Sequence, residues 1–250
     1  MDTGEGSARP ALLAVAHGSR DPRHAAALSG LIDAVRRAAP DLRAELAFLD
    51  LCGPDATTAL ARLAASGARN VIVVPLFLSH GYHVTHDIPA VTARALQDLR
   101  RPSRHKVAAS VTVTVTIADP LGPDPLILDA LDRRLRESDI WPSDPALRIV
   151  VASATSPDGT TADEIAALRS RGESEIAVAS YFLAPGLLHD RVRAEARAAG
   201  VPITAPLTTP DGEPPPELVR LVLSRHANGP LPAWGTARIV RTNRSAVTVS

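Results

Sequence analysis

Histidines follow two apolar runs in this chain, which contains eight histidines among 250 residues. His17 comes directly after the apolar run 11–16, in the stretch "HGSRDP". His80, His83 and His86 follow a second apolar run, in the stretch "PLFLSHGYHVTHDIP". Imidazole binds borderline divalent metal ions and accepts protons near neutral pH. These positions are therefore candidates for metal binding, for proton transfer, or for both.

The pattern of apolar residues places these histidines at the ends of strands. The run 11–16 predicts a strand, and the following segment has apolar residues at helical spacing, with Asp21 as a helix N-cap and Pro22 in the first turn. The alternation continues, with further strands expected at 43–51, 70–78, 106–118, 147–153, 174–183 and 201–205, and helices at 23–40, 54–67, 87–99, 124–138, 161–172, 189–200 and 215–226. Strands that are apolar on both faces and alternate with helices are typical of a parallel sheet covered on both sides. We therefore predict an α/β fold.

The carboxyl ends of parallel strands are where an open α/β sheet binds its ligands. His17 follows the first strand, Asp50 lies near the end of the second, and the cluster of His80, His83 and His86 follows the third. His83 is favoured within the cluster because it follows an expected bend in a loop, whereas His86 is expected to enter the next helix. Two imidazoles and a carboxylate suit Fe²⁺, Co²⁺ or Ni²⁺. A histidine at a strand end can equally be a packed or solvent-facing side chain, so both readings stay open here.

The residues after His17 favour an anionic ligand. Gly18 permits a tight turn, and Ser19 and Arg20 follow it directly. The exposed amides at the start of the next helix attract negative charge as well. We therefore expect Ser19 and Arg20 to bind an anionic group.

Charge and cysteine content exclude several classes of protein. The formal net charge is zero, so bulk electrostatics give no reason to expect a nucleic acid or an anionic membrane as partner. Cys52 is the only cysteine, which excludes an internal disulfide and any site with several thiolates. The N-terminal apolar run is too short for a signal peptide or a membrane span, so a cytoplasmic protein is expected.

The second half of the chain resembles a shortened copy of the first. The stretches "GARNVIVVPLFLSHGYH" and "GESEIAVASYFLAPGLL" align without gaps, which sets Leu188 opposite His83. Aligning the first strands sets Ser153 opposite His17. Chance similarity between two αβ units is the alternative; if the repeat is real, only the first half keeps the histidines. The predicted division is a flexible N-terminus (1–10), a catalytic lobe (11–122), a degenerate second lobe (123–226) and a tail (227–250).

Four ordered motifs carry a resemblance to a known family. "LLAVAHGSRDP", "AELAFLDLCGPD", "GARNVIVVPLFLSHGYHVTHDIPA" and "PLGPDPLILDAL" follow one another as in the class II chelatases, of the CbiX and SirB type, which insert iron or cobalt into sirohydrochlorin. The resemblance covers about residues 11–138, and "ASYFLAPGLLHDRVRAEA" is similar to the second half of the two-domain members. It implies two flavodoxin-like lobes, each a parallel sheet flanked by helices, with the second lobe reduced.

The resemblance also implies a reaction and its residues. His17 and His83 match the catalytic pair, which acts on metal and tetrapyrrole in a cleft between the lobes. Asp50 stands where many members have a glutamate, so its reach to a shared metal is shorter by one methylene. Local positive charge must receive the substrate's carboxylates, and the candidates by position are Arg20, Arg191 and the helix N-terminus behind Ser19, with Ser19 itself as a substrate-binding residue. The implied substrates are a tetrapyrrole of siroheme or cobalamin biosynthesis and Fe²⁺ or Co²⁺, handled without a prosthetic group by a monomer or homodimer.

Two other functions fit parts of the sequence. A carrier that binds metal or tetrapyrrole without joining them is compatible with the degenerate second half. Histidine phosphatases also have a His-Gly pair after a first strand, but an arginine precedes that pair, and here Ala16 occupies the position.

Overall fold

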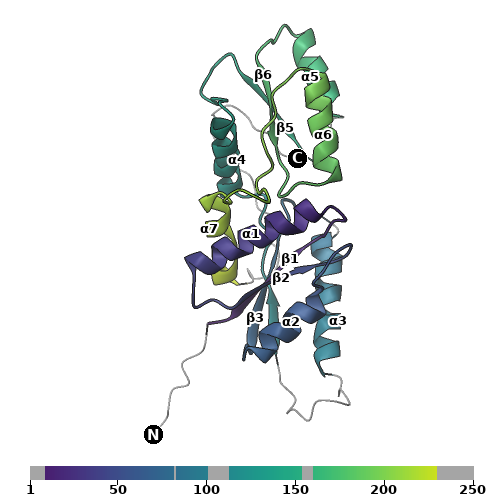
Figure 1. Cartoon of the computed structure of the whole chain (residues 1–250), viewed down its shortest axis with the longest axis vertical. Helices are drawn as coiled ribbons and strands as arrows, with labels where there is room; N and C mark the ends of the chain where they lie inside the picture. Colours follow the sequence, from purple (N-terminus) through teal and green to yellow (C-terminus); the bar gives the residue numbers. More distant parts are fainter. Residues whose placement is uncertain (1–8, 82, 101–112, 154–159, 230–250) are drawn as a thin grey trace.

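Two parallel sheets lie one above the other along the long axis of the molecule (Figure 1). The computed structural model describes residues 9–81, 83–100, 113–153 and 160–229. The first sheet has the strand order β2-β1-β3-β4, and the second pairs β5 with β6. The strands are β1 (Ala11–Ala16), β2 (Ala44–Phe48), β3 (Asn70–Pro75), β4 (Thr114–Ile117), β5 (Arg148–Ala152) and β6 (Ile176–Ser180). The predicted α/β fold with a reduced second sheet is confirmed.

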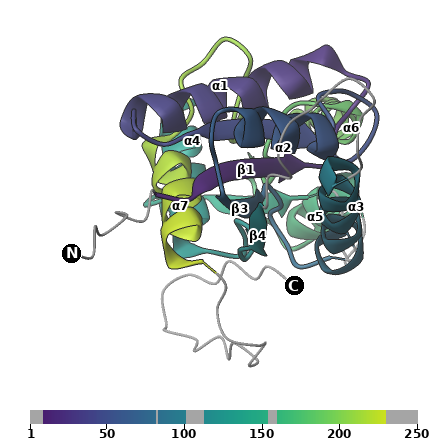
Figure 2. The same cartoon turned by 90° about the horizontal axis from the view of Figure 1, so that it is seen from below.

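Helices connect the strands and cover both faces of the first sheet. They are α1 (Pro22–Ala38), α2 (Ala56–Ala65), the π-helical turn η1 (His83–Asp87), α3 (Ile88–Arg100), α4 (Pro125–Glu137), α5 (Thr161–Ser170), α6 (Leu187–Ala198) and α7 (Pro216–Asn228). Residues of α1 and α7 pack on one face of the first sheet, and residues of α2 and α3 pack on the other. Figure 2 shows α7 and α3 on opposite sides of the strands. No helix among the described residues is both long and apolar enough to cross a membrane.

The start of α1 shows how the sequence sets a helix boundary. Asp21 is the N-cap, and its carboxylate accepts a hydrogen bond from the backbone N–H of Arg23 at 2.9 Å. Pro22 occupies the first turn, where its missing N–H costs nothing. Both predictions are confirmed, and the cap fixes where the loop after β1 ends.

Three local predictions need correction. The segment before α3 was expected to be a loop, but the chain forms η1 there, because a single wide turn has no periodicity that a sequence pattern can reveal. The strand expected at 201–205 is reduced to one bridge between Ile203 and Val178. Helix α6 begins at Leu187, two residues before the expected start, because Gly186 ends the buried segment that precedes it. The predicted strand residues 106–112 and the termini at 1–8 and 230–250 lie outside the described residues.

The last helix returns to the first sheet. Leu218, Leu221 and Val222 of α7 share a buried cluster with residues of α1 and β1. In α4, Ile127 belongs to the same cluster, whereas Leu135 packs with residues of β6. The division at residue 122 thus stays a prediction, and the cores on its two sides share helices.

Candidate functional site

The loops after β1 and β2 lie in direct backbone contact. The N–H of Asp50 donates to the carbonyl of His17 at 3.0 Å, and the N–H of Leu49 donates to that of Ala16 at 2.9 Å. Gly18 has φ +98°, and a Cβ built there would lie 1.9 Å from the carbonyl oxygen of Asp50. Only glycine fits such a position. The strand order and this glycine therefore bring His17 and Asp50 to one edge, as the sequence predicts.

The side chains of His17 and Asp50 are exposed at this edge. One carboxylate oxygen of Asp50 accepts the N–H of Leu51 at 2.7 Å, and Leu51 has a left-handed backbone with φ 67°. Cys52 is also close, because its Sγ would lie 3.4 Å from a Cβ at Gly18. An imidazole, a carboxylate and a thiol thus border the same loop contact.

The third strand end lies beside the first, because β3 pairs with β1 on the side opposite β2. His80 is exposed in the segment after β3. His86 is exposed within η1, and its Nδ1 lies 2.7 Å from Oγ1 of Thr85. The backbone of His83 begins η1, but its side chain lies outside the described part of the structure. Whether its ring meets that of His17 therefore stays a prediction.

A ready-made metal cluster is absent from the side chains that the structure describes. Among them, no three His, Cys, Asp or Glu residues lie close enough together to hold a metal ion. The predicted ligand set of His17, His83 and Asp50 includes one ring that is not described, so this finding does not test it. It does show that Asp50, His80 and His86 form no such cluster with His17.

The predicted carboxylate-binding residues differ in their surroundings. Ser19 accepts a hydrogen bond from the N–H of Asp21 at 3.1 Å, which holds the loop in a tight turn. Arg20 is exposed and makes no ion pair within the described part of the chain. Arg191 pairs with Glu195 at 3.2 Å, one turn further along α6. Arg20 is thus available to an anionic ligand, whereas the pairing of Arg191 draws its side chain away from the N-terminal end of α6.

The carboxyl ends of the two sheets face each other. The hydroxyl of Tyr181, which follows β6, donates to the carbonyl of Leu78, which follows β3, at 2.9 Å. Burial raises the pKa of Tyr181 to about 12, so the hydroxyl stays protonated and donates at neutral pH. We call the residues that follow β1, β2, β3 and β6 the facing strand ends.

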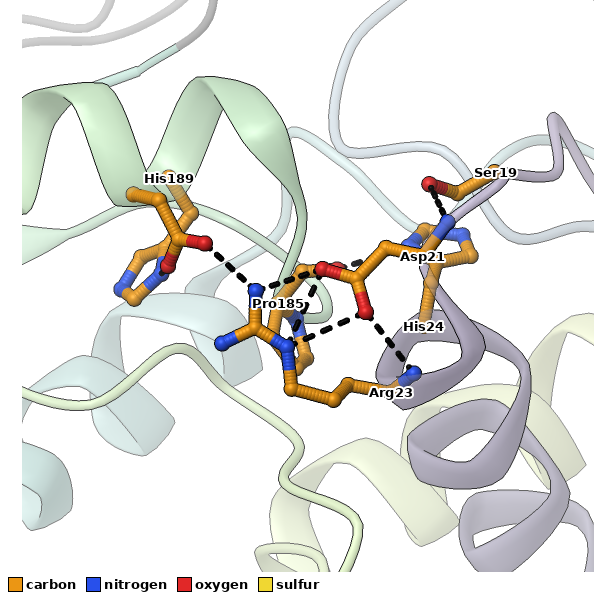
Figure 3. Close-up of polar contacts among 7 residues, drawn as sticks. Ser19, Asp21, Arg23, His24, Pro185 and His189 are labelled. Atoms are coloured by element: carbon orange, nitrogen blue, oxygen red, sulfur yellow. Dashed lines mark hydrogen bonds and ion pairs between the residues drawn. The ribbon is translucent and has the colours of Figure 1, made fainter.

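A second contact ties the start of α1 to the start of α6 (Figure 3). The guanidinium of Arg23 lies between the carboxylates of Asp21 and Asp190 and hydrogen-bonds to both. Beside it, Nδ1 of His24 lies 3.1 Å from the carbonyl of Pro185. We call these five residues the interlobe clasp. The hydrogen bond from Arg23 lowers the pKa of Asp190, so the ion pair persists over the neutral range. No pattern in the sequence predicts this contact, because it depends on how the two lobes meet.

Two histidines in or next to the clasp, the half-buried His24 and the buried His189, predict a pH dependence of stability. Burial lowers the pKa of His24 and of His189, and neither Nε2 has a hydrogen-bond partner among the residues that the structure describes. His189 packs edge-on against the ring of Phe182, with Asp190 beside it. As pH falls, the unfolded chain takes up protons near the ordinary histidine pKa of about 6.5, before the folded chain does. Stability present above that pH is therefore lost on acidification.

The expected result is a free energy of unfolding that decreases between about pH 7 and pH 5. Urea unfolding at a series of pH values measures it. His189→Leu should make the slope shallower by up to about 1.4 kcal/mol per pH unit. Equal slopes for the wild type and His189→Leu would refute the role of His189.

Comparisons with known proteins agree on one family. The CbiX family model matches residues 11–138. A sirohydrochlorin cobaltochelatase of Methanopyrus kandleri is 28% identical over 137 residues, covering 51% of this chain and 96% of the relative. A sirohydrochlorin cobaltochelatase of Methanothermobacter thermautotrophicus is 30% identical over 134 residues, covering 51% of this chain and 91% of the relative.

Solved structures match both lobes. SirB from Bacillus subtilis with Fe³⁺ superposes with a TM-score of 0.68 at 19% identity, over 88% of this chain and 95% of that one. The sirohydrochlorin chelatase SirB from Bacillus subtilis subspecies spizizenii, in complex with cobalt, superposes with a TM-score of 0.63 at 20% identity. The match covers 88% of this chain and 94% of that one. At this identity the match establishes the fold, and it extends the likeness beyond residue 138.

Proposed function

Because this chain belongs to the CbiX family, we propose that it is a chelatase that inserts a divalent metal ion, Fe²⁺ or Co²⁺, into a sirohydrochlorin-type tetrapyrrole. The single observation that carries the proposal is the family match over residues 11–138, which includes His17, Asp50 and His83. The fold supports it, since these three residues follow the adjacent strands β1, β2 and β3.

The reaction sets two requirements for the site. A free-base macrocycle loses two pyrrole protons as it gains the metal ion, so bases must lie near the ring nitrogens. The metal must also be held weakly enough to be released. A neutral imidazole accepts a proton near neutral pH and binds Fe²⁺ or Co²⁺ with moderate strength. His17 and His83 are proposed to fill both roles, with Asp50 as a third ligand.

The exposed positions suit transfer of the metal. His17 and Asp50 are open to solvent, so a metal ion reaches them without a conformational change. The four ring nitrogens then outcompete a few side-chain ligands, and the departing protons pass to the imidazoles and on to water. No nucleotide is required.

Arg20 is proposed to receive a substrate carboxylate. Because the side chain is exposed and without an ion pair in the described structure, Arg20→Ala should raise KM about three- to tenfold and change kcat little. Steady-state kinetics with varied tetrapyrrole measure both constants. Arg136→Ala, on the exposed face of α4, serves as control, and Arg191→Ala should have a smaller effect because Arg191 is paired with Glu195. An unchanged KM for Arg20→Ala would contradict the assignment.

A spectroscopic assay separates a catalyst from a carrier. Sirohydrochlorin is mixed with Fe²⁺ or Co²⁺, with and without protein, and the absorption change of metal insertion is followed. We expect a rate that increases in proportion to protein concentration and many turnovers per protein molecule. A rate equal to that without protein, or a single stoichiometric turnover, would contradict the chelatase and support the non-catalytic carrier.

The phosphatase alternative is not supported. Ala16, at the position where that alternative needs an arginine, is the buried last residue of β1. Release of phosphate from a generic phosphomonoester would support the phosphatase alternative.

A further inference from the structure

Three exposed leucines follow strands whose carboxyl ends belong to the facing strand ends. The large hydrophobic side chains that are exposed in the described part of the chain are Leu51, Leu128, Trp141, Leu187 and Leu188. Leu51 follows β2, and Leu187 and Leu188 follow β6, so three of these five lie at the facing strand ends. Scattered exposed leucines need no explanation, but a group beside a candidate site indicates a surface for an apolar ligand.

Within the segment 181–189, Leu187 and Leu188 are the exposed residues. The segment from Tyr181 to Pro185 is buried, and so is His189, which packs against Phe182. Between them, Leu187 is 83% exposed and Leu188 is 54% exposed. The neighbouring residues therefore anchor the first turn of α6, while more than half of the surface of each of these two leucines stays exposed. A single exposed leucine needs no explanation, but two adjacent exposed leucines beside a buried segment form a small apolar patch, and such patches mark binding surfaces.

The first turn of α6 is held next to the loop that carries His17. A Cβ built at Gly186 would lie 3.9 Å from Oγ of Ser19. The interlobe clasp fixes the residues on either side, since Pro185 contacts His24 and Asp190 contacts Arg23 (Figure 3). Leu187 and Leu188 thus project from a fixed turn at the edge of the proposed metal-insertion site.

Leu51 is an exposed leucine with an unusual backbone conformation in the loop after β2. Leu51 adopts φ 67°, a left-handed conformation that costs a leucine about 1 kcal/mol. The bond from its N–H to the carboxylate of Asp50 helps to hold it there. Strained residues cluster where a ligand is bound, and Leu51 directly follows Asp50, whose N–H donates to the carbonyl of His17.

From these observations we infer that Leu187 and Leu188 contact the face of the tetrapyrrole macrocycle, with Leu51 as the apolar contact from the first lobe. The inference rests on the proposed function and assigns substrate contacts to the second lobe. The ligand matches the surface in chemistry, because its conjugated ring is flat and apolar while its rim carries carboxylates. The leucines can pack against the apolar face of the ring. Arg20, which is exposed on the adjoining loop, can bind a carboxylate at the rim. A hydrated metal ion alone would make no use of leucines.

The double variant Leu187→Ala/Leu188→Ala tests the inference by direct binding. Metal-free sirohydrochlorin is titrated into the protein, and its Kd is read from the change in absorption or fluorescence. Each methylene removed from an apolar contact weakens binding several-fold, and the ring covers the leucines only in part, so we expect Kd to rise about tenfold. In the insertion assay, KM should rise similarly while kcat changes less than about threefold.

Two controls make the result specific. Leu128→Ala, an equally apolar change at an exposed leucine of α4, should leave Kd unchanged. The conservative variant Leu187→Met/Leu188→Met should keep the wild-type affinity, which a general loss of structure would not allow. The affinity for Co²⁺ alone should be the same in every variant.

An unchanged Kd and KM in Leu187→Ala/Leu188→Ala would overturn the inference, as would an equal loss in Leu128→Ala. Failure of the proposed function has a different signature. A wild type that binds sirohydrochlorin but does not accelerate metal insertion would refute the chelatase and still leave the leucine contact to be decided by the binding titration.

Discussion

Replacing His17 by alanine should slow metal insertion by about a hundredfold or more. A positioned proton acceptor contributes about 10²- to 10⁴-fold to a rate, and His17 is proposed to serve as metal ligand as well. The measurement is the initial rate of the absorption change with saturating sirohydrochlorin and Co²⁺, corrected for the rate without protein. Because the side chain is exposed, its loss should leave the free energy of unfolding nearly unchanged.

His86→Ala is the matched control for His17→Ala. His86 is also an exposed histidine close to a strand end, and its ring lies against Thr85. Its removal should change the rate less than about threefold. If His17→Ala keeps the wild-type rate, or if His86→Ala loses as much as His17→Ala, then His17 has no special part in catalysis.

Replacing Gly18 by alanine should be the most damaging single change to the fold of the site. The added Cβ would lie 1.9 Å from the carbonyl oxygen of Asp50, and φ +98° is unfavourable for alanine. The loops after β1 and β2 must therefore separate, which breaks the bond between the Asp50 N–H and the His17 carbonyl. We expect a loss of about 3 kcal/mol or more in the free energy of unfolding, measured in urea, and a loss of activity.

Gly30→Ala tests whether that loss is specific to the turn. Gly30 lies within α1, and a Cβ there would meet no atom within 4 Å. Alanine favours the helix over glycine, so this variant should be as stable as the wild type or more stable by up to about 1 kcal/mol. A Gly18→Ala protein as stable as Gly30→Ala would contradict the described contact between the two loops.

Local chemistry explains which parts of the fold could be predicted from sequence. The N-cap at Asp21 and the left-handed turn at Gly18 depend on neighbouring residues, so both were predictable. Parallel pairing also follows from apolar strands that alternate with helices, and it brings His17 and Asp50 to one edge. By contrast, η1 is one turn long, and no periodic pattern can reveal it.

Contacts between distant segments were not predictable. The return of α7 to the first sheet and the bond from Arg23 to Asp190 depend on the relative placement of two lobes. The hydrophobic pattern predicts that a helix has an apolar face, but it does not predict which sheet that face covers. The exposure of Leu187 was not predictable for the same reason, since hydrophobicity alone does not show whether a leucine is packed or exposed.

The central claim is that His17 and His83 bind one metal ion. X-ray absorption spectroscopy of Co²⁺ bound to the protein, without tetrapyrrole, counts imidazole ligands directly. We predict two imidazole nitrogens in the wild type and one in either His17→Ala or His83→Ala, with weaker binding in both variants. A coordination shell that is the same in the wild type and both variants would contradict the claim.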